Sequence, residues 1–351
     1  MGRLSLLLVN PSSIPDALLP LADDLESADA LIGAAVTEAC RHTIPVQDPA
    51  PRIERAVKWL RSGSVEGRLY RVNGRVEGIV VWESGHPAGF YVEALYLRPS
   101  PRAVQVYHAL LERIEAECGP VALLPGHLAG LSSESEESLM RERGFAPFGR
   151  SEMRFPSAAP VPPARPLAGL RVRPLRPEDE AELARLHAAA FGPTFDFYLF
   201  QIDTDPARDS ALAVRDMLGG RYGECLWWAS HVAEHPDGTL RGGCVFVRAP
   251  YGPLLVSVHV DPAAQGRGIG RALVVASVRV LRERDESVIA LNVTEGNRRA
   301  IALYERLGFV RTLGPDYGWY SRARVPVAPD AEASRPGSTR PTASARGDGA
   351  P

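Results

Sequence analysis

The 351-residue sequence predicts a mixed α/β fold (an α+β mixed sheet) built as two tandem units, each a twisted mixed sheet flanked by helices. Three observations predict it. Strand-like and helix-like segments alternate in the same order in both halves of the chain. A stretch rich in Pro and Ala, residues 156–169, is typical of a linker between units 1–155 and 170–323. The tail 324–351 has few large apolar residues and is expected to be disordered.

The first half begins with a short apolar run and two helical stretches. The dipeptide Asn73-Gly74 between two apolar runs predicts a hairpin, because both residue types tolerate the positive φ of a tight turn. A strand, a helix, a strand and a helix follow. The expected strands are 4–9, 90–97 and 121–124, the hairpin is 67–82, and the helices are 22–41, 50–61, 103–117 and one that ends before Gly144.

The second half repeats this order with a longer connection after its first helix. Alternating apolar residues predict the strands, and apolar residues three and four apart predict the helices. The expected strands are 170–175, 254–260 and 288–293, the hairpin is 225–249, and the helices are 178–191, 271–284 and 297–309.

The two halves differ at one place. Pro99 and Pro262 each follow the fourth strand, and Arg102 and Arg271 each open the next helix. The second interval is longer by six residues, the length of the stretch 265–270. We therefore expect the first half to be a copy without this stretch. Chance similarity of two ordinary α/β units is the alternative.

The composition of the chain argues against several classes of function. A net charge of −2 offers no strongly basic surface, so neither nucleic acid nor a membrane is expected as a partner. The four cysteines are far apart and form no zinc or dithiol pattern, so we expect no metal and a reducing compartment. The apolar run at 4–9 is too short for a signal peptide or a membrane span. We expect a cytoplasmic monomer or homodimer.

The stretch DPAAQGRGIGRALVV, residues 261–275, places Gly266, Gly268 and Gly270 between a strand and a helix. A helix N-terminus has unpaired N–H groups and the positive end of the helix dipole, so it favours an anion. Glycines remove the side chains that would block the approach. The dinucleotide pattern would need glycine at 271, and the P-loop would need Gly-Lys-Ser/Thr, so neither motif fits. A flexible turn is the alternative.

Two motifs give the second half a family resemblance. The stretch VHVDPAAQGRGIGRAL, residues 258–273, resembles the Q/R-x-x-G-x-G/A loop of the GNAT superfamily of acyl-CoA-dependent N-acetyltransferases. The stretch NRRAIALYERLGF, residues 297–309, is similar to the N-x-x-A-x-x-x-Y-x-x-x-G-F helix of that family. The resemblance covers about 170–322, and by topology alone 1–155.

The resemblance implies roles for individual residues. The cofactor would be acetyl-CoA as co-substrate, its pyrophosphate held at the loop and its pantetheine arm along the fourth strand. Asn297 would bond the cofactor arm, and Tyr304 would be the general acid that protonates the leaving thiolate. The implied cofactor-binding residues are Val258, His259 and Val260 by main-chain bonds, then Gln265, Gly266, Arg267, Gly268, Ile269, Gly270 and Arg271 of the loop, and Asn297.

Tyrosine suits the role of general acid on the condition that it donates its proton while the thiolate is still forming. A thiol has a pKa of about 8.5 and tyrosine one of about 10, so transfer to a finished thiolate is uphill by roughly 2 kcal/mol. Tyr304 therefore helps most as charge develops on sulfur. A core tyrosine on an amphipathic helix is the alternative.

The sequence offers several candidates for the base that would take a proton from the amine. Counting by twos from Val260 predicts Val258, Val256 and Leu254 as the inward positions of the fourth strand, all apolar. Family members often have Glu or His there. His259 is expected on the opposite face as a packed residue. Asn292, Glu295, a residue of 192–224, or desolvation of the amine are left as candidates.

The order of the halves resembles the mycothiol synthase family, whose tandem chains have a degenerate first half and acetylate a cysteinyl pseudodisaccharide amine. That family has Glu where Leu254 stands, so this acceptor is one alternative among primary amines of small molecules or peptides. The aromatic segment 191–209 borders the expected acceptor site, and its Asp196, Asp203, Asp205 and Asp209 suit either a cation or helix capping.

The first half lacks the residues that the family motif requires. Met140 stands where the second half has Tyr304, and Ser133 stands where it has Asn297, so no catalysis is expected there. Two further readings of the whole chain stay open: a non-catalytic acyl-CoA-binding sensor, and a structural protein with a chance glycine loop.

Overall fold

The computed structural model describes residues 18–20, 23–43, 50–62, 66–83, 89–126, 128–192 and 194–325. The strand expected at 4–9 and the tail beyond residue 325 lie outside the described residues. Within the described part, no helix is long and apolar enough to span a membrane.

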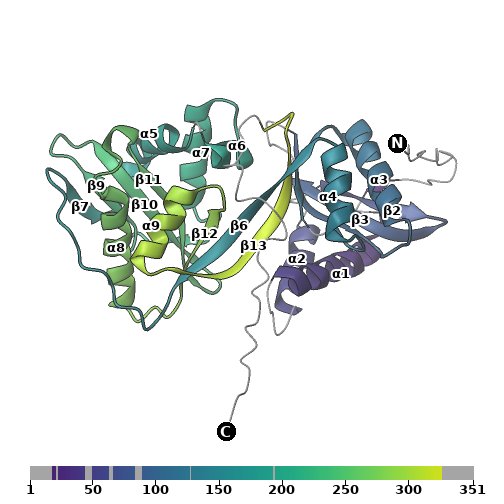
Figure 1. The fold of residues 1–351 in the computed structure, drawn as a ribbon, viewed down its shortest axis with the longest axis horizontal. Helices are drawn as coiled ribbons and strands as arrows, with labels where there is room; N and C mark the ends of the chain where they lie inside the picture. The colour runs from purple at the N-terminus through teal and green to yellow at the C-terminus, as the bar shows by residue number, and fades with distance from the viewer. Residues whose placement is uncertain are drawn as a thin grey trace, which may run out of the picture.

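From α1 onward the first half forms the predicted order of elements, and it adds two strands, a short one before α1 and one at its end (Figure 1). Asn73 and Gly74 have φ of 48° and 78°, so the predicted hairpin turn is confirmed. The elements are β1 (Leu18–Pro20), α1 (Leu25–Thr43), α2 (Ala50–Arg61), β2 (Glu66–Val72), β3 (Arg75–Glu83), β4 (Phe90–Leu97), α3 (Ala103–Cys118), β5 (Val121–Pro125), α4 (Ser133–Glu142) and β6 (Phe145–Phe155).

The second half differs from expectation at three places. The strand expected over 225–234 is broken by a turn into β8 and β9, the long connection contains two helices, and a further strand, β13, follows the last helix. The elements are β7 (Arg171–Pro174), η3 (Pro177–Asp179), α5 (Glu180–Phe191), α6 (Phe195–Leu199), α7 (Pro206–Leu218), β8 (Glu224–Cys225), β9 (His231–Glu234), β10 (Leu240–Ala249), β11 (Gly252–Val260), η4 (Pro262–Ala264), α8 (Ile269–Arg282), β12 (Ile289–Thr294), α9 (Arg298–Leu307) and β13 (Val310–Ser321).

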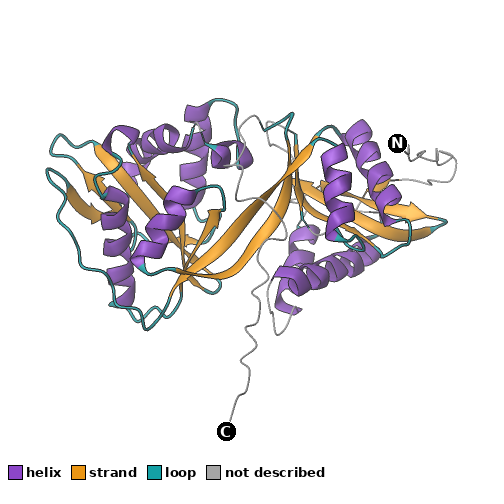
Figure 2. Ribbon diagram, in the orientation of Figure 1, coloured by secondary structure: helices purple, strands orange, loops and turns teal. Residues whose placement is uncertain are grey.

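One 13-stranded sheet runs through both halves, in the order β1-β2-β3-β4-β5-β13-β6-β12-β11-β10-β9-β7, with β8 on β10. Figure 2 shows the strands continuing from one half into the other with helices packed against them. Each half contains a parallel pair, β4–β5 and β11–β12, followed by a helix. The predicted mixed α/β fold of two like units is therefore confirmed.

The two halves exchange their last strands. β6 of the first half pairs with β12 of the second, and β13 of the second half pairs with β5 of the first. β6 and β13 also pair with each other, and they cross the middle of the molecule side by side (Figure 1). The division into units 1–155 and 170–323 stays a prediction, because each half completes the sheet of the other.

The exchange extends into the core of the second half. Met153 and Phe155 of β6 are buried in the same cluster as residues of α8 and α9. The segment predicted as a linker, 156–169, has no helix or strand, but its Leu167 packs on this cluster and its Pro163 accepts a hydrogen bond from Arg271.

Candidate active site

The strands β11 and β12 pair only briefly and then separate. Their parallel ladder joins Leu254 to Ala290 and Leu255 to Leu291 and goes no further. On its other edge, β11 pairs with β10 as far as Val260. The edge of β11 beyond Leu255 that faces β12 therefore has open main-chain groups, which is where the resemblance places the main chain of Val258, His259 and Val260 against the cofactor arm.

A bulge in β11 changes which side chains line the two faces of this gap. Val245 pairs with Ser257 and Phe246 with Leu255, so Val256 is an extra residue. Val258 and Val260 pack with the core beneath α8 and α9, whereas Val256 packs on the opposite face, against α5 and α7.

The expectation that Val258, Val256 and Leu254 share one face is therefore wrong. Counting by twos fails at the bulge, which moves one residue out of phase. Leu255 lies in the core beneath α8, so Leu254 faces the α5 side together with Val256. This face of β11 carries no carboxylate.

His259 is packed inside the protein, as expected. Its side chain is 1% exposed, its Nδ1 lies 2.8 Å from the Ser257 hydroxyl oxygen, and its ring contacts those of His187 and Phe191 on α5. Burial and the neighbouring His187 lower its pKa well below the usual value. Its Nε2 is buried beside Gly243 rather than in the gap.

The buried position of His187 predicts that the protein loses unfolding free energy in acid. Burial lowers the pKa of His187 to about 4, below the 6.5 expected in the unfolded chain. Its contribution is fully present above pH 6.5 and is lost as the pH falls toward 4, because only the unfolded state then binds the proton. We expect wild type to lose about 3 kcal/mol of unfolding free energy through this group.

Denaturant unfolding between pH 7.5 and 4.5 checks this expectation. A His187→Gln variant should lose less stability than wild type over that interval. The same pH slope in both proteins would contradict the assignment.

The glycine loop precedes α8 and opens toward solvent. Gly266 and Gly268 have φ of 81° and 82°, and a Cβ atom at either would meet nothing within 4 Å. Gly268 is the N-cap of α8, so the free amides of the first turn face this open space. Arg267 is exposed between the two glycines. The loop therefore fits an anionic group such as a pyrophosphate.

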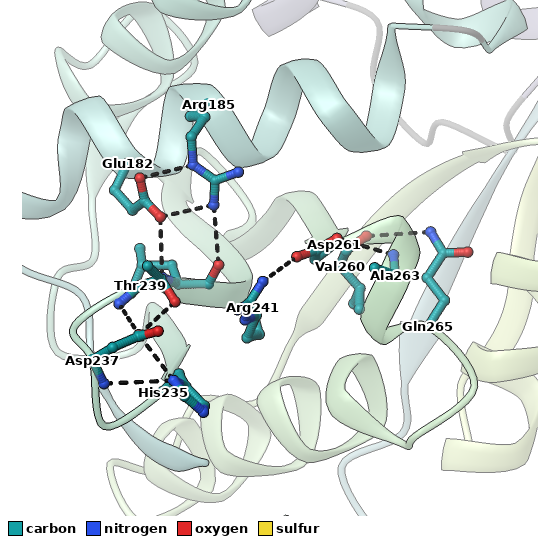
Figure 3. A network of polar contacts seen from close by, with 11 residues as sticks. Glu182, Arg185, His235, Asp237, Thr239, Arg241, Val260, Asp261, Ala263 and Gln265 are labelled. Carbon is teal, nitrogen blue, oxygen red and sulfur yellow. Dashed lines mark hydrogen bonds and ion pairs between the residues drawn. The ribbon is translucent and has the colours of Figure 1, made fainter. Parts of the chain in front are cut away.

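Both ends of the loop are fixed. Asp261 accepts hydrogen bonds from the amide of Ala263 at 3.0 Å and from Arg241 at 2.8 Å, and Gln265 donates to the carbonyl of Val260 at 3.2 Å (Figure 3). Beneath the loop, Ile269 is buried against Gly242, where a Cβ atom would come within 2.5 Å of its Cγ2. A Cβ atom at Gly270 would lie 3.6 Å from Val260. The helix N-terminus is thus held beside β11.

Helix α9 carries Asn297 and Tyr304. Asn297 is the N-cap, and its Oδ1 accepts the amide of Ala300 at 3.1 Å, which leaves its NH2 group for a ligand. Tyr304 is 8% exposed and packs on Phe309. Burial, then the neighbouring Cys244 and Asp196, raise the pKa of Tyr304 above its usual value. Its hydroxyl therefore carries its proton at neutral pH, as a general acid must. Because the raised pKa makes transfer to a finished thiolate more unfavourable, the proton has to move while charge is still developing on the sulfur.

The polar side chains around the gap, two carboxylates and one amide, have different hydrogen-bond partners. Glu295 accepts hydrogen bonds from Ser151 of β6 and from Arg311 of β13, at 2.6 Å for the latter. Asn292 is exposed on β12. Asp196 of α6 accepts the hydroxyl of Thr294 at the end of β12. Glu295, a candidate base from the sequence, is therefore held in an ion pair.

The acceptor segment 191–209 divides into two kinds of aspartate. Asp205 is the N-cap of α7, while Asp203 and Asp209 accept backbone N–H groups of the turn and loop before that helix, so local structure explains all three. Asp196 makes no such bond and reaches the gap instead. Sequence reasoning missed Thr294, Ser151 and Arg311, and no local pattern could have found the last two, because they belong to the exchanged strands.

The first half lacks the corresponding features. Met140 is fully buried in the core, and Ser133 opens α4 while Ser132 provides the cap. The N-cap of α3 is Arg102 with φ of −107°, where α8 has a left-handed glycine. The absence of catalysis there stays a prediction. Among the described residues, no group of His, Cys, Asp and Glu side chains could hold a metal ion.

Comparison with known proteins places this site in a family. The sequence model of the Acetyltransferase (GNAT) family matches residues 195–309. A mycothiol acetyltransferase from Kineococcus radiotolerans is 30% identical over 313 residues, which cover 83% of this chain and 92% of that protein. One from Thermomonospora curvata is 29% identical, covering 75% of this chain and 84% of that protein.

Solved structures agree in fold. A GCN5-related N-acetyltransferase from Sphaerobacter thermophilus has a TM-score of 0.58 at 18% identity, covering 88% of this chain and 95% of that one. A tandem GNAT protein from the clavulanic acid pathway has a TM-score of 0.55 at 16% identity, covering 86% and 97%. The fold and the site thus define an acyltransferase of tandem type. The chain belongs to the GNAT acetyltransferase family, a group that uses acyl-CoA.

Proposed function

We propose that the chain is an N-acetyltransferase that moves an acetyl group from acetyl-CoA to a primary amine of a small molecule or peptide. One observation supports it above the others: β11, with its open edge, lies beside the glycine loop of α8, and Tyr304 of α9 is buried in the core cluster on which Val258 and Val260 of β11 pack. We expect action in the cytoplasm, as a monomer or homodimer, without nucleic acid or membrane.

Each part of the gap has a role in this proposal. The amides from Gly266 to Arg271 hold the pyrophosphate of acetyl-CoA, and the main chain of Val258 to Val260 and the Asn297 amide hold its arm. The bound co-substrate supplies an activated thioester. Tyr304 would donate its proton to the sulfur as the amine nitrogen bonds to the acetyl carbon and the carbon–sulfur bond breaks, and the proton lost from nitrogen would pass through solvent and restore the tyrosine hydroxyl. Leu254 and Val256 form an apolar wall that favours the neutral, nucleophilic form of the amine.

A cysteinyl pseudodisaccharide amine is the acceptor that the relatives favour. Two of them, named mycothiol acetyltransferases, match this chain over most of their length. The glutamate expected for that chemistry is replaced by Leu254, so this chain would hold the same amine by different groups. Purified protein should therefore be tested on cysteinyl amines first, by release of the CoA thiol.

The cofactor part of the proposal is tested by Gly268→Glu. We expect acetyl-CoA at 100 times its Kd to stabilise wild type by about 2.7 kcal/mol, seen as a rise in Tm, and to leave the variant unchanged. The new carboxylate would occupy the space of the pyrophosphate and repel it.

Gly238→Glu is the matched control. Gly238 has φ of 87° and open space around it, so the variant carries the same backbone strain and charge at the β9–β10 turn, away from the loop. It should keep the Tm rise. Equal rises in all three proteins would contradict the loop assignment. Binding without thiol release on any amine would favour the sensor reading.

A further inference from the structure

We propose that the first half binds an amphipathic organic anion, a compound with an apolar body and a terminal carboxylate or phosphate, in a pocket between α3 and the β2–β3 hairpin. This site is separate from the proposed acetyl transfer and does not depend on it. The pocket has a volume of about 720 Å³. Sites for small molecules usually measure about 300–1,000 Å³.

The pocket lies where the first half lacks the glycine loop. Gly78 of β3 and Gly242 of β10 occupy equivalent places, each opposite the last residue of the neighbouring strand. In the second half, Ile269 at the start of α8 covers Gly242, where a Cβ atom would come within 2.5 Å of its Cγ2. The atoms nearest to a Cβ atom at Gly78 belong to β4 instead. Helix α3 therefore does not cover this end of the sheet as α8 does.

The inner wall of the pocket is apolar. Its side chains come from β2, β4 and α3, and they belong to the core cluster of the first half or pack on it: Tyr70, Val72, Leu97 and Val106. Tyr70 is 6% exposed and Leu97 is 3% exposed, so the surrounding core holds both side chains in place. Burial against this wall would remove the apolar body of a ligand from water.

The rim of the pocket is positively charged. Arg75 at the start of β3, Arg98 after β4 and Arg102 before α3 are exposed and line it. Arg98 forms an ion pair with Glu77 at 3.8 Å. The guanidinium groups of Arg75 and Arg102 have no ion-pair partner in the part of the chain that the structure describes. Two arginines are therefore left to bind a carboxylate or phosphate.

The pocket is distinct from the place that corresponds to the proposed cofactor gap. That gap lies between β11 and β12 in the second half, and the parallel pair β4–β5 is its counterpart in the first. In the sheet, β4 lies between β3 and β5, and none of the described residues that line the pocket belongs to β5. The ligand would therefore lie on the β3 side of β4, where the geometry fits a molecule with its charge at one end.

The test measures binding of anilinonaphthalene sulfonate to the full chain by fluorescence. This probe joins an apolar ring system to one anionic group, and saturating acetyl-CoA keeps it out of the gap of the second half. We expect Arg102→Glu to raise the Kd about 10-fold or more, because a charged contact is lost and repulsion replaces it. The Arg102 side chain makes no capping bond to α3, and a carboxylate is favourable at a helix N-terminus, so Tm should not fall. Arg75→Glu, at an exposed hairpin position, should raise the Kd likewise.

Two controls isolate the pocket and the charge. Arg208→Glu makes the same reversal in the first turn of α7, at an exposed arginine outside the pocket, and its Kd should equal that of wild type. Phenylnaphthylamine has the same rings without the sulfonate, and it should bind wild type and Arg102→Glu alike. A wild type that does not bind the sulfonate, or a Kd that neither Arg102→Glu nor Arg75→Glu changes, overturns this inference. Neither result bears on acetyl transfer.

Discussion

Replacing Tyr304 by phenylalanine should lower kcat about 100-fold or more, with little change in the affinity for acetyl-CoA. General acids contribute about 10²- to 10⁴-fold, and phenylalanine fills nearly the same space without a proton to donate. The ring packing on Phe309 would persist, so the fold should be retained. Release of the CoA thiol at saturating amine measures kcat, and the Tm rise with acetyl-CoA reports binding.

Tyr107→Phe is the matched control for this variant. Tyr107 is a fully buried helical tyrosine of the first half, whose hydroxyl donates to the carbonyl of Ala129 at 3.0 Å. Its loss should lower Tm and leave kcat unchanged, because that half has no glycine loop. If Tyr304→Phe turned over as fast as wild type, the tyrosine would be a core residue only.

Removing residues 1–155 should abolish the folded state of the remainder. β12 would lose its partner β6, and β13 would lose both of its partners, β5 and β6. The core beneath α8 would also lose Met153 and Phe155, which are 0% and 1% exposed. Removing one buried side chain of this size costs about 2–5 kcal/mol of unfolding free energy. A whole domain is stable by only about 5–15 kcal/mol.

Circular dichroism and thermal unfolding of the 156–351 fragment measure this outcome. We expect aggregation or a non-cooperative transition. Co-expression of 1–155 with 156–351 should restore a soluble complex, because the paired edges would be complete again. A fragment that unfolds cooperatively and binds acetyl-CoA by itself would show that the exchanged strands are dispensable.

Local patterns predicted most of the elements correctly. The hairpin at Asn73-Gly74 and the loop before α8 depend on glycine and asparagine conformations that a few residues determine. α7 was missed, although Asp205 followed by Pro206 is a helix start signal: the aspartate caps and the proline takes the first helical position. β6 and β13 were also missed, because they follow the Gly-Phe pairs that close the preceding helices and their partners, β12, β5 and each other, are far away in sequence.

The sequence alone determined the family, the glycine loop and the position of Tyr304, because each depends on residues close together along the chain. Tertiary structure decided the rest. The bulge at Val256 is visible only through the pairing of β11 with β10, and it separates Val258 from Leu254. The exchange of β6 and β13, the ion pair of Glu295 and the meeting of Asp196 with Thr294 join residues far apart in sequence. Such contacts depend on strand order, which no local pattern specifies.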